Sequence, residues 1–177
     1  MNLFNRKKTL SARLAHDAAR AGICKEWHDD LLAMTDKDDM VEMYLRGIDF
    51  CLSNDFPDNE TIRANFKGVM ERHGVFLDDA IDVANMPKVV ALGETNGIVK
   101  FDEYAVTEVF AKHNSMLNVY ASGHAFVVVD LFDNAIVHVY ATDRARVVVN
   151  RYDGGQVFNH ADSANAVRVR EKHKKTY

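Results

Sequence analysis

The second half of the chain repeats a pattern of apolar and polar positions every ten residues. From residue 97 onward, mostly apolar residues stand at positions ending in 7 and 9, and a small residue usually stands two places before each pair. The pairs are Thr107/Val109, Leu117/Val119, Val127/Val129, Val137/Val139, Val147/Val149, Val157/Asn159 and Val167/Val169, with Thr107 and Asn159 as the exceptions. Alternation within each unit is typical of a β-strand, and its strict recurrence is typical of a solenoid whose coils stack.

A second period of twenty residues sets the size of one coil. The residues that match at this spacing include Ala121/Ala141, Tyr120/Tyr140 and Phe132/Tyr152. A coil of ten residues would leave no room for an interior, whereas a coil of twenty has two strands joined by polar corners, such as Asp133-Asn134. Residues 97–169 therefore predict about four coils. We expect the six valines of the central pairs, at 127–149, to be buried and stacked.

The first half of the chain has the spacing of amphipathic helices instead. Apolar residues recur three and four apart in Leu10, Leu14 and Ala18, and again from Met40 to Cys51. The expected capping and breaking residues are Thr9 or Ser11, Gly22, Thr35-Asp36 or Asp38, Asn59 and the pair His73-Gly74. These signals predict four short helices packed as a small bundle.

Together these patterns predict an α+β fold, a small N-terminal helical bundle followed by a short β-solenoid of about four 20-residue coils. Residues 1–96 contain 12 Lys and Arg against 17 Asp and Glu, while 97–177 contain 10 against 9, so the halves differ in charge. We expect a helical domain over 1–87, the solenoid over 88–172 and a basic tail over 173–177. Bare strand edges invite pairing with other chains, so the helices and the tail are expected to cover the two ends.

The composition is that of a globular protein. Of the 177 residues, 47% are apolar and 27% charged, with two prolines and two cysteines, which excludes collagen-like, low-complexity and disulfide-framework classes. The apolar runs are far shorter than the roughly 20 residues that cross a bilayer, and the first ten residues lack the apolar segment of a secretion signal. We therefore expect a cytoplasmic protein with no membrane contact.

Residues 133–141, DNAIVHVYA, resemble the D-N-A-x-V-x-V-Y-A repeats of uncharacterised proteins from gut-type bacteria and their phages or prophages. Gly22-Ile23-Cys24 with Trp27, and residues 47–51, GIDFC, resemble the helical leader of the same proteins. The likeness covers most of the chain and carries no catalytic motif. It implies an origin in a mobile element.

Candidate catalytic and metal-binding residues are few. Cys24 and His28 lie four apart, with His16 as a third candidate ligand, but no second matched pair completes a zinc pattern, and Cys24 and Cys51 are expected to be buried thiols. Residues 122–124, SGH, lack the G-x-S-x-G context of a nucleophile, and the six-residue period of hexapeptide acyltransferases is absent. We expect no enzyme activity, cofactor or metal. The alternative is a hydrolase or transferase with a site near Pro87–Gly97, at the expected junction of the halves.

The outward positions of the solenoid supply the strongest functional signal. If positions 7 and 9 point inward, Val106, Phe126, Val128 and Val148 point outward, where polar residues are expected. This apolar strip predicts a protein partner or a homo-oligomer, unless the helical half covers it. The opposite face is more mixed and looks less like an interface, with Met116, Asn118, Ile136, His138, Gln156 and Phe158.

The leading hypothesis is therefore a non-enzymatic protein-interaction or assembly module. A nucleic-acid or nucleotide binding module is the alternative, because residues 168–175 and the segment Arg6-Lys7-Lys8 are basic.

Overall fold

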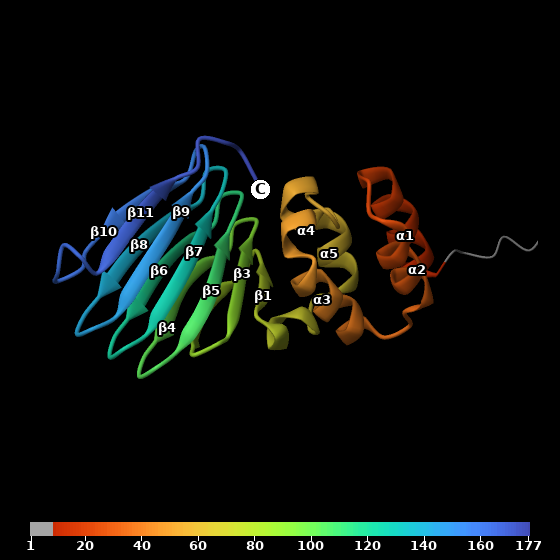
Figure 1. Ribbon diagram of the computed structural model, residues 1–177. Coiled ribbons are helices and arrows are strands. Elements are labelled where there is room, and N and C mark those ends of the chain that lie inside the picture. The colour runs from red at the N-terminus through yellow and green to blue at the C-terminus, as the bar shows by residue number, and fades with distance from the viewer. Residues whose placement is uncertain (1–8) are drawn as a thin grey trace, which may run out of the picture. The chain divides into compact units, whose positions relative to one another are not determined.

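The computed structural model describes residues 9–177, and the chain divides into two compact units between Val69 and Met70. The first unit is helical and the second is a β-solenoid (Figure 1). The boundary expected near Pro87 is wrong, because residues 75–84 already form strands that pair with later coils.

From residue 9 onward, the helical unit contains five short helices rather than the expected four. They are α1 (Leu10–Ala21), α2 (Lys25–Ala33), α3 (Lys37–Arg46), α4 (Ile48–Asn54) and α5 (Asn59–Asn65). The apolar run expected as one helix is split at Gly47, which ends α3 and begins α4. A Cβ at Gly47 would lie 2.8 Å from Cζ3 of Trp27, so the indole ring packs directly against this break. No helix in residues 9–177 is long and apolar enough to cross a membrane.

The helix ends follow the capping residues in the sequence, with one shift. Thr9 caps α1 through its side chain, Gly22 ends that helix with a left-handed φ of 92°, and the Asp36 side chain caps α3. Asp58, not Asn59, caps α5, because its carboxylate accepts a hydrogen bond from the backbone N–H three residues later at 2.7 Å. Local hydrogen bonding therefore determines most of these boundaries.

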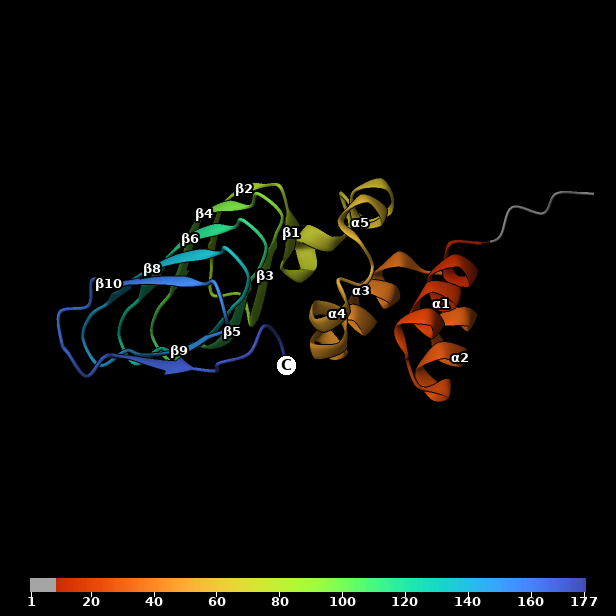
Figure 2. The ribbon, with the colours of Figure 1, turned by 90° about the horizontal axis from the view of Figure 1, so that it is seen from above.

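The solenoid begins with the short 3-10 helix η1 (Met70–His73) and continues through eleven strands. They are β1 (Val75–Leu77), β2 (Ala80–Ala84), β3 (Lys88–Leu92), β4 (Asn96–Phe101), β5 (Val106–Ala111), β6 (Met116–Ala121), β7 (Phe126–Leu131), β8 (Ile136–Ala141), β9 (Arg146–Arg151), β10 (Gln156–Asn159) and β11 (Val167–Glu171). Successive strands alternate between two parallel sheets, six-stranded β1-β3-β5-β7-β9-β11 and five-stranded β2-β4-β6-β8-β10. Figure 2 shows the two sheets as opposite sides of one coil.

The fold is the predicted α+β arrangement, but the solenoid has about five coils rather than four. The first coil is shorter than the others, because β1 pairs with β3 at Val75↔Val90 and β2 pairs with β4 at Ile81↔Gly97. From β3 onward the paired residues are twenty apart, as in Val127↔Val147. The shortened coil breaks the ten-residue phase, and this explains why its strands were not expected.

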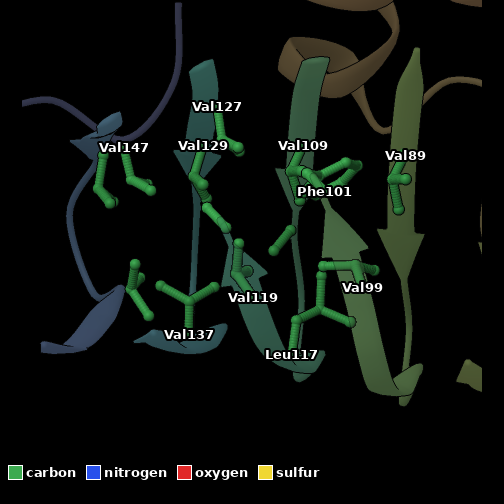
Figure 3. Packing of buried hydrophobic residues seen from close by; sticks show 14 of the residues in the cluster. Val89, Val99, Phe101, Val109, Leu117, Val119, Val127, Val129, Val137 and Val147 are labelled. Atoms are coloured by element: carbon green, nitrogen blue, oxygen red, sulfur yellow. The ribbon is translucent and has the colours of Figure 1, made fainter. Parts of the chain in front are cut away.

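Most of the residues at positions 7 and 9 are stacked in the interior of the solenoid, although Val169 on β11 is 42% exposed. The six valines at 127–149 are all fully or almost fully buried, which confirms the predicted phase. Figure 3 shows that the side chains of the two sheets point toward one another. The polar exception Thr107 is also buried, and its hydroxyl donates a hydrogen bond to the backbone carbonyl of Met86 at 2.7 Å. Asn159 lies in the final strand of its sheet and is exposed.

The corners repeat as regularly as the strands. One residue in each of the six corners from residue 93 to residue 143 has a left-handed φ between 53° and 64°: Gly93, Glu103, His113, Gly123, Asp133 and Asp143. In the next corner Gly154 has a φ of 93°. Two residues after Asp133, the small residue Ala135 is completely buried. The Ala135 N–H donates a hydrogen bond to the carbonyl of Phe132 at 3.1 Å. The Asp143 carboxylate accepts a hydrogen bond from the Gly123 N–H one coil away at 3.0 Å. Corners are therefore linked from coil to coil.

The segment expected as a basic tail is docked on the solenoid. The Asp153 N–H donates to the Lys174 carbonyl at 3.0 Å, and the Lys174 ammonium lies 6.0 Å from the Tyr152 ring centroid. The Tyr177 ring meets the rings of Phe132 and Tyr152 edge to face at 5.3 and 5.5 Å. Residues 173–177 are thus held by aromatic packing as well as by their charge.

Candidate interaction surfaces

The structure brings the four predicted interface residues together on the outer face of the six-stranded sheet. Val106 on β5 pairs with Phe126 on β7, and Val128 on β7 pairs with Val148 on β9. Val106 is 73% exposed and Phe126 is 41% exposed, while Val128 and Val148 are half-buried. These four residues form one apolar strip that crosses three neighbouring strands.

A stacked aromatic pair lies in the corners that precede two strands of the apolar strip, and the sequence reasoning missed it. Tyr104, in the corner before β5, stacks on His124, in the corner before β7, with ring centroids 4.9 Å apart. Tyr104 is 77% exposed. The separation of twenty residues was the available signal, because residues one coil apart occupy equivalent corners.

Charged residues of opposite sign border the apolar strip. Glu108 on β5 pairs with Val128, and Arg168 on β11 pairs with Val148, so the acidic and basic side chains stand on opposite sides of the two valines. Arg146 on β9 pairs with Phe126. Glu108 also forms an ion pair with the Lys88 ammonium at 3.1 Å. Within residues 9–177, neither arginine has an ion-pair partner.

The outer face of the five-stranded sheet carries a ladder of stacked rings. Tyr120 stacks on Tyr140 at 4.5 Å, Tyr140 on His160 at 4.7 Å, and His138 on Phe158 at 4.7 Å. A hydrogen bond of 3.1 Å joins Nδ1 of His138 to Nε2 of His160. This face is more regular than the mixed surface that the sequence suggested. Its rings pack on one another, and so they offer partners mainly their edges.

The candidate metal ligands are not assembled into a site. Cys24 is exposed at the start of α2, contrary to the expectation of a buried thiol, while Cys51 is buried as expected, and both are free thiols. His16 and His28 each hydrogen-bond the aspartate that follows them in the chain. No group of three or more His, Cys, Asp or Glu in the described part of the chain could hold a metal ion.

Burial changes the chemistry of Cys51 and of Tyr44. Burial, with a smaller contribution from the charge of Asp49, raises the pKa of the Cys51 thiol to about 12. Burial also raises the pKa of Tyr44, with Cys51 and Asp55 adding to the effect. A thiol that stays protonated at neutral pH is a poor nucleophile, so Cys51 has the properties of a core residue.

The segment Pro87–Gly97, proposed for a catalytic site, lies within the solenoid and not at the boundary of the two units. It forms β3, a corner and the start of β4. The Gly93 N–H donates to Nδ1 of His113 at 3.0 Å, and the Glu94 carboxylate accepts from the Asn114 side chain at 2.8 Å. These polar groups link neighbouring corners of the solenoid.

The basic residues proposed for nucleic-acid contact are only partly described. Arg168 and Arg170 are two residues apart on β11 and therefore lie on the same face of the strand. The Arg151 guanidinium binds the Glu171 carboxylate at 2.9 Å. Arg6, Lys7 and Lys8 lie outside the described residues. The cations of the last coil are thus partly neutralised within the sheet.

No protein-family model, curated protein or solved structure matches this chain, and the geometry of its surfaces carries the functional argument.

Proposed function

We propose that this protein is a non-enzymatic interaction module whose solenoid binds another protein through the apolar strip. The observation that carries the proposal is the exposure of Val106 and Phe126 on a sheet whose other face is a fully packed interior. Parallel strands bonded on both sides hold these side chains in fixed positions. A rigid, exposed apolar patch with a polar border is typical of a protein-binding surface.

The setting follows from the other sequence features. The likeness of residues 133–141 to repeats of phage-associated proteins supports an origin in a mobile element. The short apolar runs favour action in the cytoplasm. The origin in a mobile element and the cytoplasmic location are both parts of the proposal.

Light scattering of the double variant Phe126→Glu/Val148→Glu tests the use of the apolar strip. We expect the variant to lose an oligomer or bound protein that the wild type retains, because two carboxylates would have to be buried at the interface. The control is Met116→Glu/Ile136→Glu, which places the same charges on outward positions of the five-stranded sheet. Unchanged association of the first variant would contradict the proposal.

Site-specific crosslinking covers a partner that is lost during purification. A photoreactive side chain at Val106 should form a covalent protein adduct in the producing cell, whereas the same group at the exposed Ala84 on β2 should not. The mass of the adduct distinguishes a second copy from another protein. Equal adducts at both positions, or none at Val106, would argue against the apolar strip.

A nucleic-acid binding function is the second candidate. Arg146, Arg168 and Arg170 lie on the neighbouring strands β9 and β11 and are exposed. If they contact phosphates, DNA or RNA should bind with an affinity that falls steeply with salt and falls further in Arg168→Glu/Arg170→Glu. The absence of binding to DNA and RNA at low salt would remove this candidate.

A further inference from the structure

We infer that the protein bound by the apolar strip is a second copy of this chain, in a face-to-face dimer whose two-fold axis runs along the strands between β7 and β9. The inference rests on the proposed function, since it uses the same surface and names its occupant. It is carried by the order of charged and apolar residues across the six-stranded sheet. In a facing copy this order is reversed, so that apolar residues lie opposite apolar residues and acidic residues lie opposite basic ones.

One row of outward side chains crosses the sheet at right angles to the strands. Its members, in strand order from β3 to β11, are Lys88, Glu108, Val128, Val148 and Arg168. A two-fold axis between β7 and β9 reverses this order in the facing copy. Val128 then faces Val148 of the partner subunit, and Glu108 faces Arg168 of the partner subunit. Symmetry makes each of these contacts occur twice.

The neighbouring row agrees with the same axis. It contains Val106, Phe126 and Arg146 on β5, β7 and β9. Reversal places Phe126 opposite Arg146 of the partner subunit, where a guanidinium can lie on the exposed ring. Val106 faces the start of the partner's β11. The two rows therefore place apolar groups at the centre and opposite charges or cation-ring pairs around them.

The charges favour this axis over a displaced one. Moving the axis by half a strand spacing, onto β7, would place Glu108 opposite Val148 of the partner subunit and Lys88 opposite Arg168 of the partner subunit. Such a register loses the acid-base contact and brings two cations together. With the axis between β7 and β9, the strand β3 that carries Lys88 faces no strand of the other copy. The position of the axis is therefore set by electrostatic complementarity, which fixes register at interfaces.

The absence of ion pairs at Arg146 and Arg168 also supports a second copy as the bound protein. Arg146 and Arg168 have no ion pair within residues 9–177, although carboxylates are frequent in this chain. Both stand at the border of an apolar strip, where a dimer would partly shield them from solvent. Opposite charges at equal distances from one axis are what an isologous interface requires.

The contact area predicts a weak dimer. Four overlapping strands of about 20 Å length at a spacing of about 4.8 Å give roughly 400 Å² of flat area per copy. This contact is small beside a standard interface, which buries roughly 800 Å² of accessible surface per partner, so we expect a weak, reversible dimer. Sedimentation velocity from low to high micromolar concentration is therefore the suitable measurement.

Charge reversal at the outer pair tests the axis directly. Glu108→Arg alone and Arg168→Glu alone should each raise the dimer dissociation constant by about tenfold or more, because each places like charges together twice. The two single variants mixed together should form a dimer as readily as the wild type, since reversal restores both opposite-charge contacts in the mixed pair. The double variant Glu108→Arg/Arg168→Glu should also dimerise.

The matched control reverses an ion pair on the other sheet. Lys100 on β4 binds Asp82 on β2 at 2.8 Å, so Asp82→Arg/Lys100→Glu changes a cross-strand pair of the same kind away from the proposed interface. We expect its dimerisation to be unchanged. Thermal unfolding followed by circular dichroism shows whether each single variant is folded, and the mixing experiment needs only that both are.

The possible results separate this inference from the proposed function. A wild type that stays monomeric at all concentrations overturns the inference that the bound protein is a second copy. An adduct of Val106 with a different protein would then still support the apolar strip as an interface. A dimer that Phe126→Glu/Val148→Glu leaves intact overturns both. A dimer that depends on the strip but is unaffected by charge reversal, or is not restored by mixing, overturns the two-fold arrangement.

Discussion

The Tyr177 hydroxyl donates a hydrogen bond of 2.5 Å to the carboxylate of Asp130 on β7, across 47 residues of sequence. The same carboxylate accepts a hydrogen bond from the Asn150 side chain at 2.6 Å. Asp130 is only 8% exposed, and two donors thus satisfy an acidic group that would otherwise be costly to bury. The contact joins the last described residue to the middle of the solenoid.

Removing the Tyr177 hydroxyl should destabilise the solenoid. Tyr177→Phe keeps the ring contacts with Phe132 and Tyr152 but leaves Asp130 with one donor fewer, so we expect a loss of about 1–3 kcal/mol in the free energy of unfolding. Urea unfolding followed by circular dichroism measures the loss. Tyr104→Phe is the control, because Tyr104 is 77% exposed, and it should change the free energy by less than about 0.5 kcal/mol. Equal effects would contradict the role of the hydroxyl.

Two valines on neighbouring strands test the inward and outward phases. Val129 on β7 is completely buried, whereas Val106 on β5 points outward. Val129→Ala should lower the free energy of unfolding by about 2 kcal/mol, because it leaves a cavity in the stacked interior. Val106→Ala should lower it by less than about 0.5 kcal/mol. A larger loss for Val106→Ala would show that the strand phase is wrong.

The recurring small residue of each corner should not tolerate a large side chain. Ala135 is completely buried, and the equivalent residue one coil later, Gly155, has room for no Cβ, which would lie 2.8 Å from Cγ of Leu131. Ala135→Leu should therefore destabilise the solenoid by about 1–3 kcal/mol through overpacking. Ala84→Leu, at an exposed strand position, is the matched control and should be close to neutral. Thermal unfolding of the two variants side by side is sufficient.

The helical unit should lose stability at alkaline pH. The folded Cys51 thiol keeps its proton up to a pKa of about 12, whereas the unfolded thiol releases it from its ordinary pKa of 9.0. The stability that this contributes is complete below pH 9.0 and is lost as the pH rises toward about 12. The raised pKa of Tyr44 acts in the same direction. Urea unfolding at increasing pH, followed by the fluorescence of the single tryptophan, Trp27, measures the decline.

Replacing the thiol separates the contribution of Cys51 from other alkaline effects. Cys51→Ala should be less stable at neutral pH but should decline less steeply above pH 9.0. Cys24→Ala is the control and should keep the steep decline, because it removes the exposed thiol and leaves the buried Cys51 in place. Identical slopes for all three proteins would show that Cys51 does not ionise on unfolding. Thiol reagents should also label Cys24 far faster than Cys51 in the folded protein.

Parts of the fold could be predicted because the chain repeats itself. The alternation of Val127, Val129 and the polar corner at Asp133-Asn134 recurs often enough to indicate strands, a coil of twenty residues and the buried set. The first coil could not be predicted from the repeat, because its strands pair with residues fifteen or sixteen positions away, as in Val75↔Val90. A repeat is visible only where its period is constant.

The candidate surface was also only partly predictable from the sequence. The phase of the repeat was enough to place Val106, Phe126, Val128 and Val148 on one outer face. The charges that border them, Glu108 and Arg168, went unnoticed, although they are three coils of twenty residues apart and are brought into one row by three successive strand pairings. Spacing along one strand does not reveal what stands beside it.

The amino-acid pattern thus specifies which side of each strand faces inward and how long a coil is, because both depend on the two-residue period of a strand and on corner chemistry repeated along the chain. Exposure on the outer face depends on three-dimensional neighbours instead. Val106 and Phe110 point outward from the same strand, yet the first is 73% exposed and the second 4%, with the Lys88 ammonium 5.6 Å from the Phe110 ring centroid. Burial of an outward side chain requires atoms from other coils, and only folding brings those atoms to it.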